Sequence, residues 1–79
     1  MSTDHQVLGA IAKLQHQRAA DISAFIISQE IEGATGKKIG YGTLHRSLSR
    51  LEDRGVLKSR WECPRQVEDR PRRKFYSIA

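Results

Sequence analysis

A leucine stripe near the middle of the 79-residue chain constrains the fold more than any other feature. Leu44, Leu48 and Leu51 recur at the spacing of one narrow helical stripe, which a stable domain must bury against other elements. Gly55 stands where a helix can end in the left-handed conformation, and Val56 is placed to contact Leu51 in a Schellman ending. The pattern predicts a helix over residues 41–54 with one buried edge and one polar edge.

Two further helices are predicted ahead of this one, over residues 5–17 and 21–32. Asp4 and Asp21 are the expected N-caps, because a short acidic side chain can accept from free N–H groups of a first turn. The apolar stripes are Val7, Leu8, Ile11 and Leu14 in the first helix and Ala24, Ile27, Ser28 and Ile31 in the second.

Gly33 and Gly36 are expected to stop the second helix, because glycine takes the left-handed conformation at low cost. Lys37 and Lys38 then lie in a linker, directly before the next helix.

The remaining residues, 56–78, alternate in the manner of a β-hairpin. Leu57 and Trp61 share one side of its first strand, and Tyr76 and Ile78 share one face of its second. Trp61 is expected to pack the hairpin against the core. Three helices followed by a two-stranded ribbon predict an α+β fold, a winged helix-turn-helix that occupies residues 1–79 as one domain.

Positive charge is concentrated in the second half of the chain. Residues 1–36 hold two cationic and four anionic side chains, a net charge of −2, whereas residues 37–79 hold twelve and five, a net charge of +7. Such asymmetry, with an isoelectric point near 9.9, is typical of a protein that binds a polyanion. A merely solubilising surface is the alternative explanation.

The polar edge of the third helix suits the major groove of double-stranded DNA. Arg46 is the first candidate for reading a base, because arginine can bind guanine O6 and N7 together. His45 can donate to a base or a phosphate. The candidate residues of this recognition helix are Tyr41, Thr43, His45, Arg46, Ser47 and Arg50, and those of the linker and wing are Lys37, Lys38, Arg65, Arg70, Arg72, Arg73 and Lys74.

Two stretches also resemble a known family. Residues 41–62 read Tyr-Gly-Thr-Leu-His-Arg-Ser-Leu-Ser-Arg-Leu-Glu-Asp-Arg-Gly-Val-Leu-Lys-Ser-Arg-Trp-Glu, and residues 70–78 read Arg-Pro-Arg-Arg-Lys-Phe-Tyr-Ser-Ile. This order resembles the signature of the PadR family of bacterial transcriptional regulators, with His45 where the family commonly has tyrosine. The resemblance implies a winged-helix repressor that binds double-stranded DNA.

PadR members usually continue past the wing into helices that form a dimer and, in some members, bind a small effector. This sequence ends at Ala79, directly after the last predicted strand. We therefore expect a homodimer through the first helix, with Phe25 or Ile26 contributing, and leave the effector open. Binding as several copies along DNA, or together with a larger partner, are the alternatives.

Two other function classes stay open: a winged-helix module that binds a protein partner, for which an exposed Ile26 or Phe75 would be suited, and an architectural DNA binder with little base reading. No catalytic constellation, phosphate-binding glycine loop or metal-ligand spacing is present in the sequence, so we expect no enzyme, cofactor or metal. No secretory signal or membrane span is predicted, and the expected location is the cytoplasm, at the bacterial nucleoid. Cys63, the sole cysteine, is either an inert thiol or a redox-active one.

Overall fold

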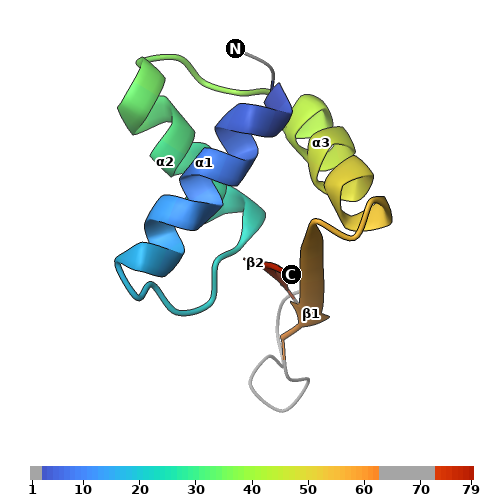
Figure 1. Ribbon diagram of the computed structural model, residues 1–79. Coiled ribbons are helices and arrows are strands. Elements are labelled where there is room, and N and C mark those ends of the chain that lie inside the picture. The colour runs from blue at the N-terminus through green and yellow to red at the C-terminus, as the bar shows by residue number, and fades with distance from the viewer. Residues whose placement is uncertain (1–2, 63–72) are drawn as a thin grey trace.

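Three helices are followed by a two-stranded antiparallel sheet in the computed structural model, which describes residues 3–62 and 73–79 (Figure 1). The elements are α1 (Thr3–His16), α2 (Ala24–Thr35), α3 (Tyr41–Asp53), β1 (Leu57–Trp61) and β2 (Lys74–Ile78). This order confirms the predicted α+β winged-helix class.

The hydrophobic core lies where the three helices meet above the sheet. Ile11 of α1, Ile27 of α2 and Leu48 of α3 are completely buried, and each contributes roughly 1.5–3 kcal/mol by leaving water. Leu57 and Tyr76 close the core from the side of the sheet. Since all three leucines of the predicted stripe are buried, the opposite edge of α3 faces outward.

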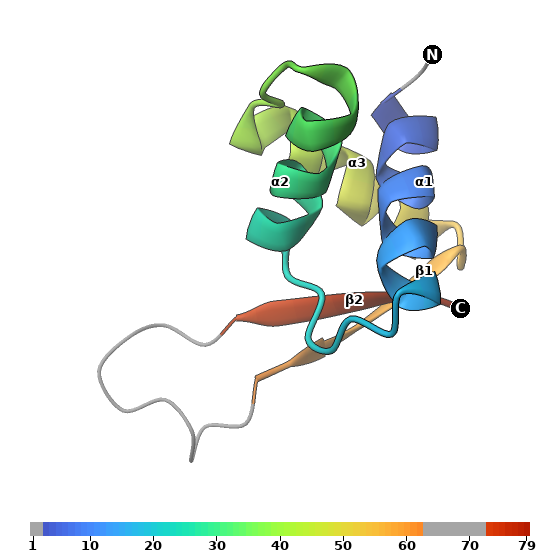
Figure 2. The same ribbon diagram turned by 90° about the vertical axis from the view of Figure 1, so that its left-hand side faces the viewer.

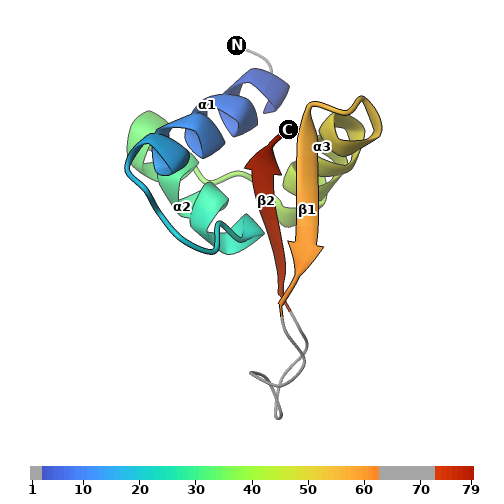
Figure 3. The same cartoon turned by 60° about the horizontal axis from the view of Figure 1, so that its bottom comes forward.

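The two strands pair in a register that separates two faces of the wing. Leu57 lies opposite Ile78, and Arg60 lies opposite Phe75. Leu57 points into the core, whereas Arg60 points to the other face, and Figure 3 shows β1 next to α3 and β2 on the side of α2. The two strands therefore pack against different helices, β1 against α3 and β2 on the side of α2.

The segment before α2 adds a short third edge to the sheet. Ser23 forms a β-bridge with Phe75, and the Tyr76 N–H donates to the carbonyl of Ile22 over 2.9 Å. Figure 2 shows this segment running close beside β2. Ile22 is buried as a result, and the chain turns into α2 only after this pairing is complete.

The pairing explains why α2 begins later than the sequence pattern indicates. Asp21 is not its N-cap, because this residue has a φ of 56° in the left-handed region. Ser23 is the N-cap instead, and its Oγ accepts from the Ile26 N–H over 3.4 Å. Asp and Asn tolerate the left-handed conformation better than most residues, which suits Asp21 to the turn.

The prediction that Gly33 stops α2 is also wrong. The helix continues through Gly33 to Thr35, and Gly36 ends it with a φ of 75° while its N–H donates to the Glu32 carbonyl. A glycine inside a helix costs only about 1 kcal/mol relative to alanine, so the second glycine, placed in the left-handed conformation, determines the end.

The end of α3 has the predicted Schellman geometry. The Val56 N–H donates to the Leu51 carbonyl over 3.0 Å, the Gly55 N–H donates to the Glu52 carbonyl over 3.0 Å, and Gly55 has a φ of 76°. The residues that end α3 thus lie within its own sequence, directly before β1.

Two expectations for the aromatic residues of the wing are wrong. Trp61, the last residue of β1, is 58% exposed instead of packing against the core, and its ring centre lies 5.7 Å from Lys74 Nζ. Phe75, offered as an exposed contact, is only 7% exposed. It is covered by its bridge to Ser23 and by the guanidinium of Arg60, which lies 4.8 Å from the ring centre.

Candidate nucleic-acid interface

The outward edge of α3 presents polar and cationic side chains to solvent. Arg46 and Ser49 lie on the edge opposite the leucines and are exposed, as is Thr43 in the first turn. His45, Arg46, Ser49 and Arg50 share one open surface. The structure therefore brings three of the six residues predicted on this helix, His45, Arg46 and Arg50, together on one surface.

Tyr41 and His45 form the flank of α3 that faces the wing. Their rings stack with centroids 5.6 Å apart and an interplanar angle of 21°. Together with Phe25, Arg73 and Lys74, they line a pocket of about 370 Å³ between the start of α2, the start of α3 and the start of β2. Arg73 and Lys74, at the start of β2, thus lie beside the first turns of α3.

Lys74 is held in place by several neighbours. Its Nζ lies 3.2 Å from the Glu52 carboxylate at the C-terminal end of α3, and 5.7 and 5.8 Å from the ring centres of Trp61 and Tyr76. Burial raises the pKa of the Tyr76 hydroxyl, so it stays protonated. Glu52 also accepts from the Ser59 hydroxyl, which joins α3 to both strands.

The opposite flank of α3 is joined to α1 by one carboxylate. Asp4 accepts from Arg50 at two atoms, Nε over 3.0 Å and Nη2 over 2.6 Å, and from the Ser47 hydroxyl over 2.5 Å. The hydrogen bond from Arg50, followed by that from Ser47, holds the pKa of the Asp4 carboxyl far below its usual range. The same bond raises the pKa of Arg50.

This arrangement corrects two sequence-based expectations. Ser47 is completely buried, so it belongs to the core edge of α3 and not to its reading edge. Asp4 lies inside the first turn of α1, which begins at Thr3, and its carboxylate binds α3 instead of capping α1. Sequence spacing gave no signal for this contact, since 43 and 46 residues separate Asp4 from its two partners.

The linker lysines lie beside the start of α3. Lys37 and Lys38 are both exposed, and Lys38 lines a groove with Phe25 and Tyr41. Phe25 is 53% exposed. The sequence analysis did not include it among the DNA-binding candidates, although it lies beside Tyr41. The other predicted wing residues, Arg65, Arg70 and Arg72, lie outside the described residues, and so does Cys63.

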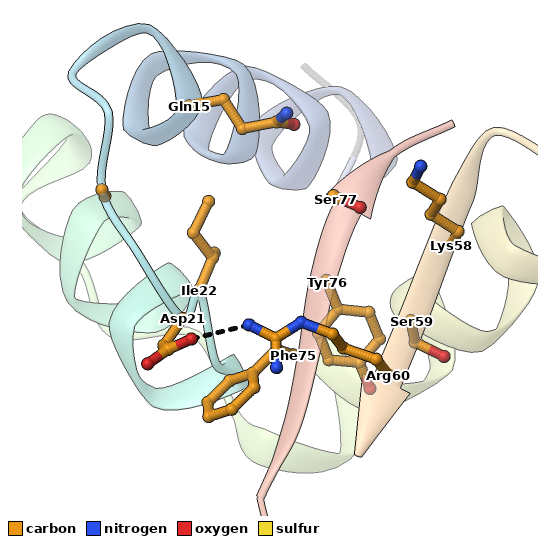
Figure 4. Close-up of a pocket in the computed structure, with 10 residues that line it drawn as sticks. Gln15, Asp21, Ile22, Lys58, Ser59, Arg60, Phe75, Tyr76 and Ser77 are labelled. Atoms are coloured by element: carbon orange, nitrogen blue, oxygen red, sulfur yellow. Dashed lines mark hydrogen bonds and ion pairs between the residues drawn. The ribbon is translucent and has the colours of Figure 1, made fainter. Parts of the chain in front are cut away.

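A cavity of about 240 Å³ lies on the other face of the wing (Figure 4). Its walls come from the end of α1, from the segment before α2 and from the face of the sheet that carries Lys58 and Arg60. Arg60 Nη2 reaches across to Asp21 Oδ1 over 2.7 Å. None of the residues that line this cavity belongs to α3.

Within residues 3–62 and 73–79 there is no cluster of three or more side chains suited to hold a metal ion. None of the helices in this described part is long and apolar enough to span a lipid bilayer.

The model of the PadR-like family of transcriptional regulators matches residues 14–79 of the sequence. The chain belongs to the PadR-like family. The match includes α2, α3 and both strands of the wing, and therefore most of the surface described above. A comparison with curated proteins gives no significant match.

Solved structures of regulators have the same fold as this PadR-like chain. A transcriptional regulator from Clostridium thermocellum is 25% identical, with a TM-score of 0.74, and the similarity covers 98% of this chain and 67% of that one. A PadR-like transcription factor from Bacteroides fragilis is 23% identical, with a TM-score of 0.64, and the coverage is 95% and 69%. The resemblance to the PadR signature stated from the sequence is thereby confirmed.

Proposed function

We propose that this PadR-like chain is a sequence-specific transcriptional regulator, a repressor in type, that inserts α3 into the major groove of double-stranded DNA in the bacterial cytoplasm. One observation carries the proposal: Arg46 lies on the exposed edge of α3, opposite three buried leucines, and its surface neighbour His45 shares a pocket with Arg73 and Lys74. A major groove about 12 Å wide accepts such a helix, and the first turns approach the base edges most closely.

In this proposal the wing and the linker bind the phosphate backbone. Arg73 lines the pocket beside His45 together with Lys74, whose ion pair with Glu52 has to open for a phosphate contact, and Arg65, Arg70 and Arg72 belong to the same wing in the sequence. Lys37 and Lys38 approach the backbone from the start of α3. Contacts of this kind position a protein on the duplex and carry little sequence information.

A homodimer through α1 is part of the proposal. A single module buries only about 600–1,000 Å² on DNA, and selective operators are normally read by two-fold dimers. α1 and α2 form a largely apolar groove of about 270 Å³ that includes Gly9, Ala10 and Ile31, which supports this face as the contact. No particular small effector is proposed.

A module that binds a protein partner is the second candidate. The exposed aromatic pair of Phe25 and Tyr41, which lines two neighbouring grooves, favours it. An architectural DNA binder is the third. The three differ in what they bind, because a protein-binding module has no affinity for duplex at low salt and an architectural protein binds every duplex equally.

The test is a fluorescence anisotropy titration of short duplexes, one selected from a random pool and one of random sequence, over a series of salt concentrations. About five to seven phosphate contacts predict a slope of log K against log salt of about −4.5 to −6. Arg73→Ala should weaken both duplexes alike and flatten the slope by about 0.9. Absence of duplex binding at low salt would refute the proposal, and equal affinity for both duplexes would favour the architectural candidate.

A further inference from the structure

We propose that Asp4 is a specificity-determining positioning residue, which holds Arg50 back from the DNA phosphates and fixes it for contact with a base edge. The proposal rests on the proposed function, because it assumes that α3 enters the major groove. It assigns to the first turn of α1 a role in discriminating one duplex from another, although α1 itself carries none of the predicted reading residues.

The geometry of the contact is that of an arginine already bound to an anion. Two guanidinium nitrogens, Nε and Nη2, donate to the two oxygens of one carboxylate. Two parallel N–H donors are also what arginine uses to bind a phosphate in bidentate fashion. Asp4 therefore occupies the Nε–Nη2 edge of Arg50, whereas the outer edge, formed by Nη1 and the second N–H of Nη2, has no partner among the described residues.

The carboxylate is fixed more firmly than the guanidinium that it holds. The Asp4 side chain is 21% exposed and that of Arg50 is 50% exposed. Asp4 also accepts from the hydroxyl of Ser47, which is completely buried. One side of the pair is thus anchored between α1 and α3, whereas Arg50 lines the same open surface as Arg46 and Ser49.

The charges on α3 also favour a base contact over a phosphate contact for Arg50. The pair of Asp4 and Arg50 has no net charge, so its attraction for a phosphate is weak compared with that of a free guanidinium, while its remaining N–H groups still suit a neutral base acceptor. Arg46, on the same surface, has no ion pair with any residue in the described part of the chain. Of the two arginines within α3, Arg50 is therefore restrained and Arg46 is not, and Arg54, the C-cap of the helix, lines the same surface.

The decisive variant is Asp4→Asn, which keeps an oxygen that can accept from Ser47 and removes the charge that restrains Arg50. One released phosphate contact steepens the slope of log K against log salt by about 0.9, equivalent to about fivefold tighter binding at roughly 0.15 M salt. We expect this gain on the random duplex. The selected duplex should change less than about twofold, because there the new phosphate contact replaces a lost base contact of comparable strength.

Two controls isolate the role of Arg50. The double variant Asp4→Asn with Arg50→Gln should lose the gain on the random duplex and the steeper slope together. Asp53→Asn removes an equal charge from the exposed face of α3, where Asp53 has no hydrogen-bond or ion-pair partner among the described residues. It measures the effect of charge alone and should change the slope less than Asp4→Asn does.

Circular dichroism establishes first that each variant is folded, and Asp4→Ser replaces Asp4→Asn if the latter is not. An unchanged salt slope in a folded Asp4 variant would overturn the inference, as would equal gains on both duplexes. Both results presuppose that the natural sequence binds duplex DNA, so failure of the proposed function itself is recognised separately, by the absence of that binding.

Discussion

Arg46 is the side chain on which base reading should depend most, since it is exposed on the outward edge of α3 and has no acidic partner in the described residues. Arg46→Ala is expected to weaken binding to the selected duplex by about 1–3 kcal/mol and to relax the preference at one base position. Competition titrations with singly substituted duplexes measure both effects. Ser49→Ala, on the same face, serves as the matched uncharged control.

Equal losses on the selected and the random duplex would show that Arg46 contacts only phosphate. The base preference would then have to come from other residues of α3, with His45 and Thr43 as the next variants to measure.

The stability of the fold should depend on pH through Asp4. Its carboxyl pKa is lower in the folded chain than its ordinary value of 3.8, chiefly because Arg50 donates to it. The contact therefore stabilises the fold fully above about pH 4 and loses this effect as the pH falls further. The thermal midpoint of the natural sequence should fall more steeply below about pH 4 than that of Asp4→Asn, as measured by circular dichroism. Parallel curves for the two proteins would contradict this.

At the scale of single residues, the sequence predicted the exposure of the polar edge of α3, but not the burial of Ser47 or the exposure of Trp61, and it did not predict side-chain partners. The positions of Arg46 and His45 on α3 followed from the leucine spacing alone. Ser47 lies at the edge of the same stripe, and a small polar residue there is compatible with either side of the helix. Its burial is decided by Asp4, which approaches from another helix, and local spacing contains no information about that approach.

Among the elements, α2 offers a matched pair of glycines. A Cβ added at Gly33 meets nothing within 4 Å, and this residue lies inside the helix. Gly33→Ala should therefore stabilise the fold by about 0.5–1 kcal/mol. Gly36 has equal space but a φ of +75°, so Gly36→Ala should destabilise by about 1–2 kcal/mol. Urea unfolding measures both, and changes of the same sign would refute this account of where α2 ends.

Elements defined by local signals were predicted most closely. The helix at Tyr41–Asp53 carries its stripe and its stop within one short stretch, and it lies within one residue of its predicted bounds. The start of α2 depends on pairing of Ser23 with Phe75, 52 positions later in the chain, so the sequence pattern placed it too early. Trp61 was misplaced for a similar reason, because alternation identifies the face of a strand but not how far the core extends along it.

For the molecule as a whole, the proposed dimer makes the sharpest prediction. Sedimentation should show a dimer at micromolar concentration. Gly9→Arg should give a monomer, because Gly9 lies exposed in the groove between α1 and α2, where a long charged side chain would block a second copy. Gly9→Ala adds only a methyl group in open space and should remain a dimer. A monomer at high concentration, with or without DNA, would exclude the α1 contact.

The root of the wing is fastened to the turn before α2 at three points: the Ser23–Phe75 bridge, the hydrogen bond from Tyr76 to Ile22, and the ion pair of Arg60 with Asp21. Glu52 of α3 contacts Ser59 and Lys74 of the two strands as well, so these contacts together set the position of the strands relative to α3. A duplex whose grooves do not match that position must bend or change its groove width, and the cost depends on its base steps. The affinity for an operator would then depend partly on the stiffness of its DNA, including base steps that no side chain contacts.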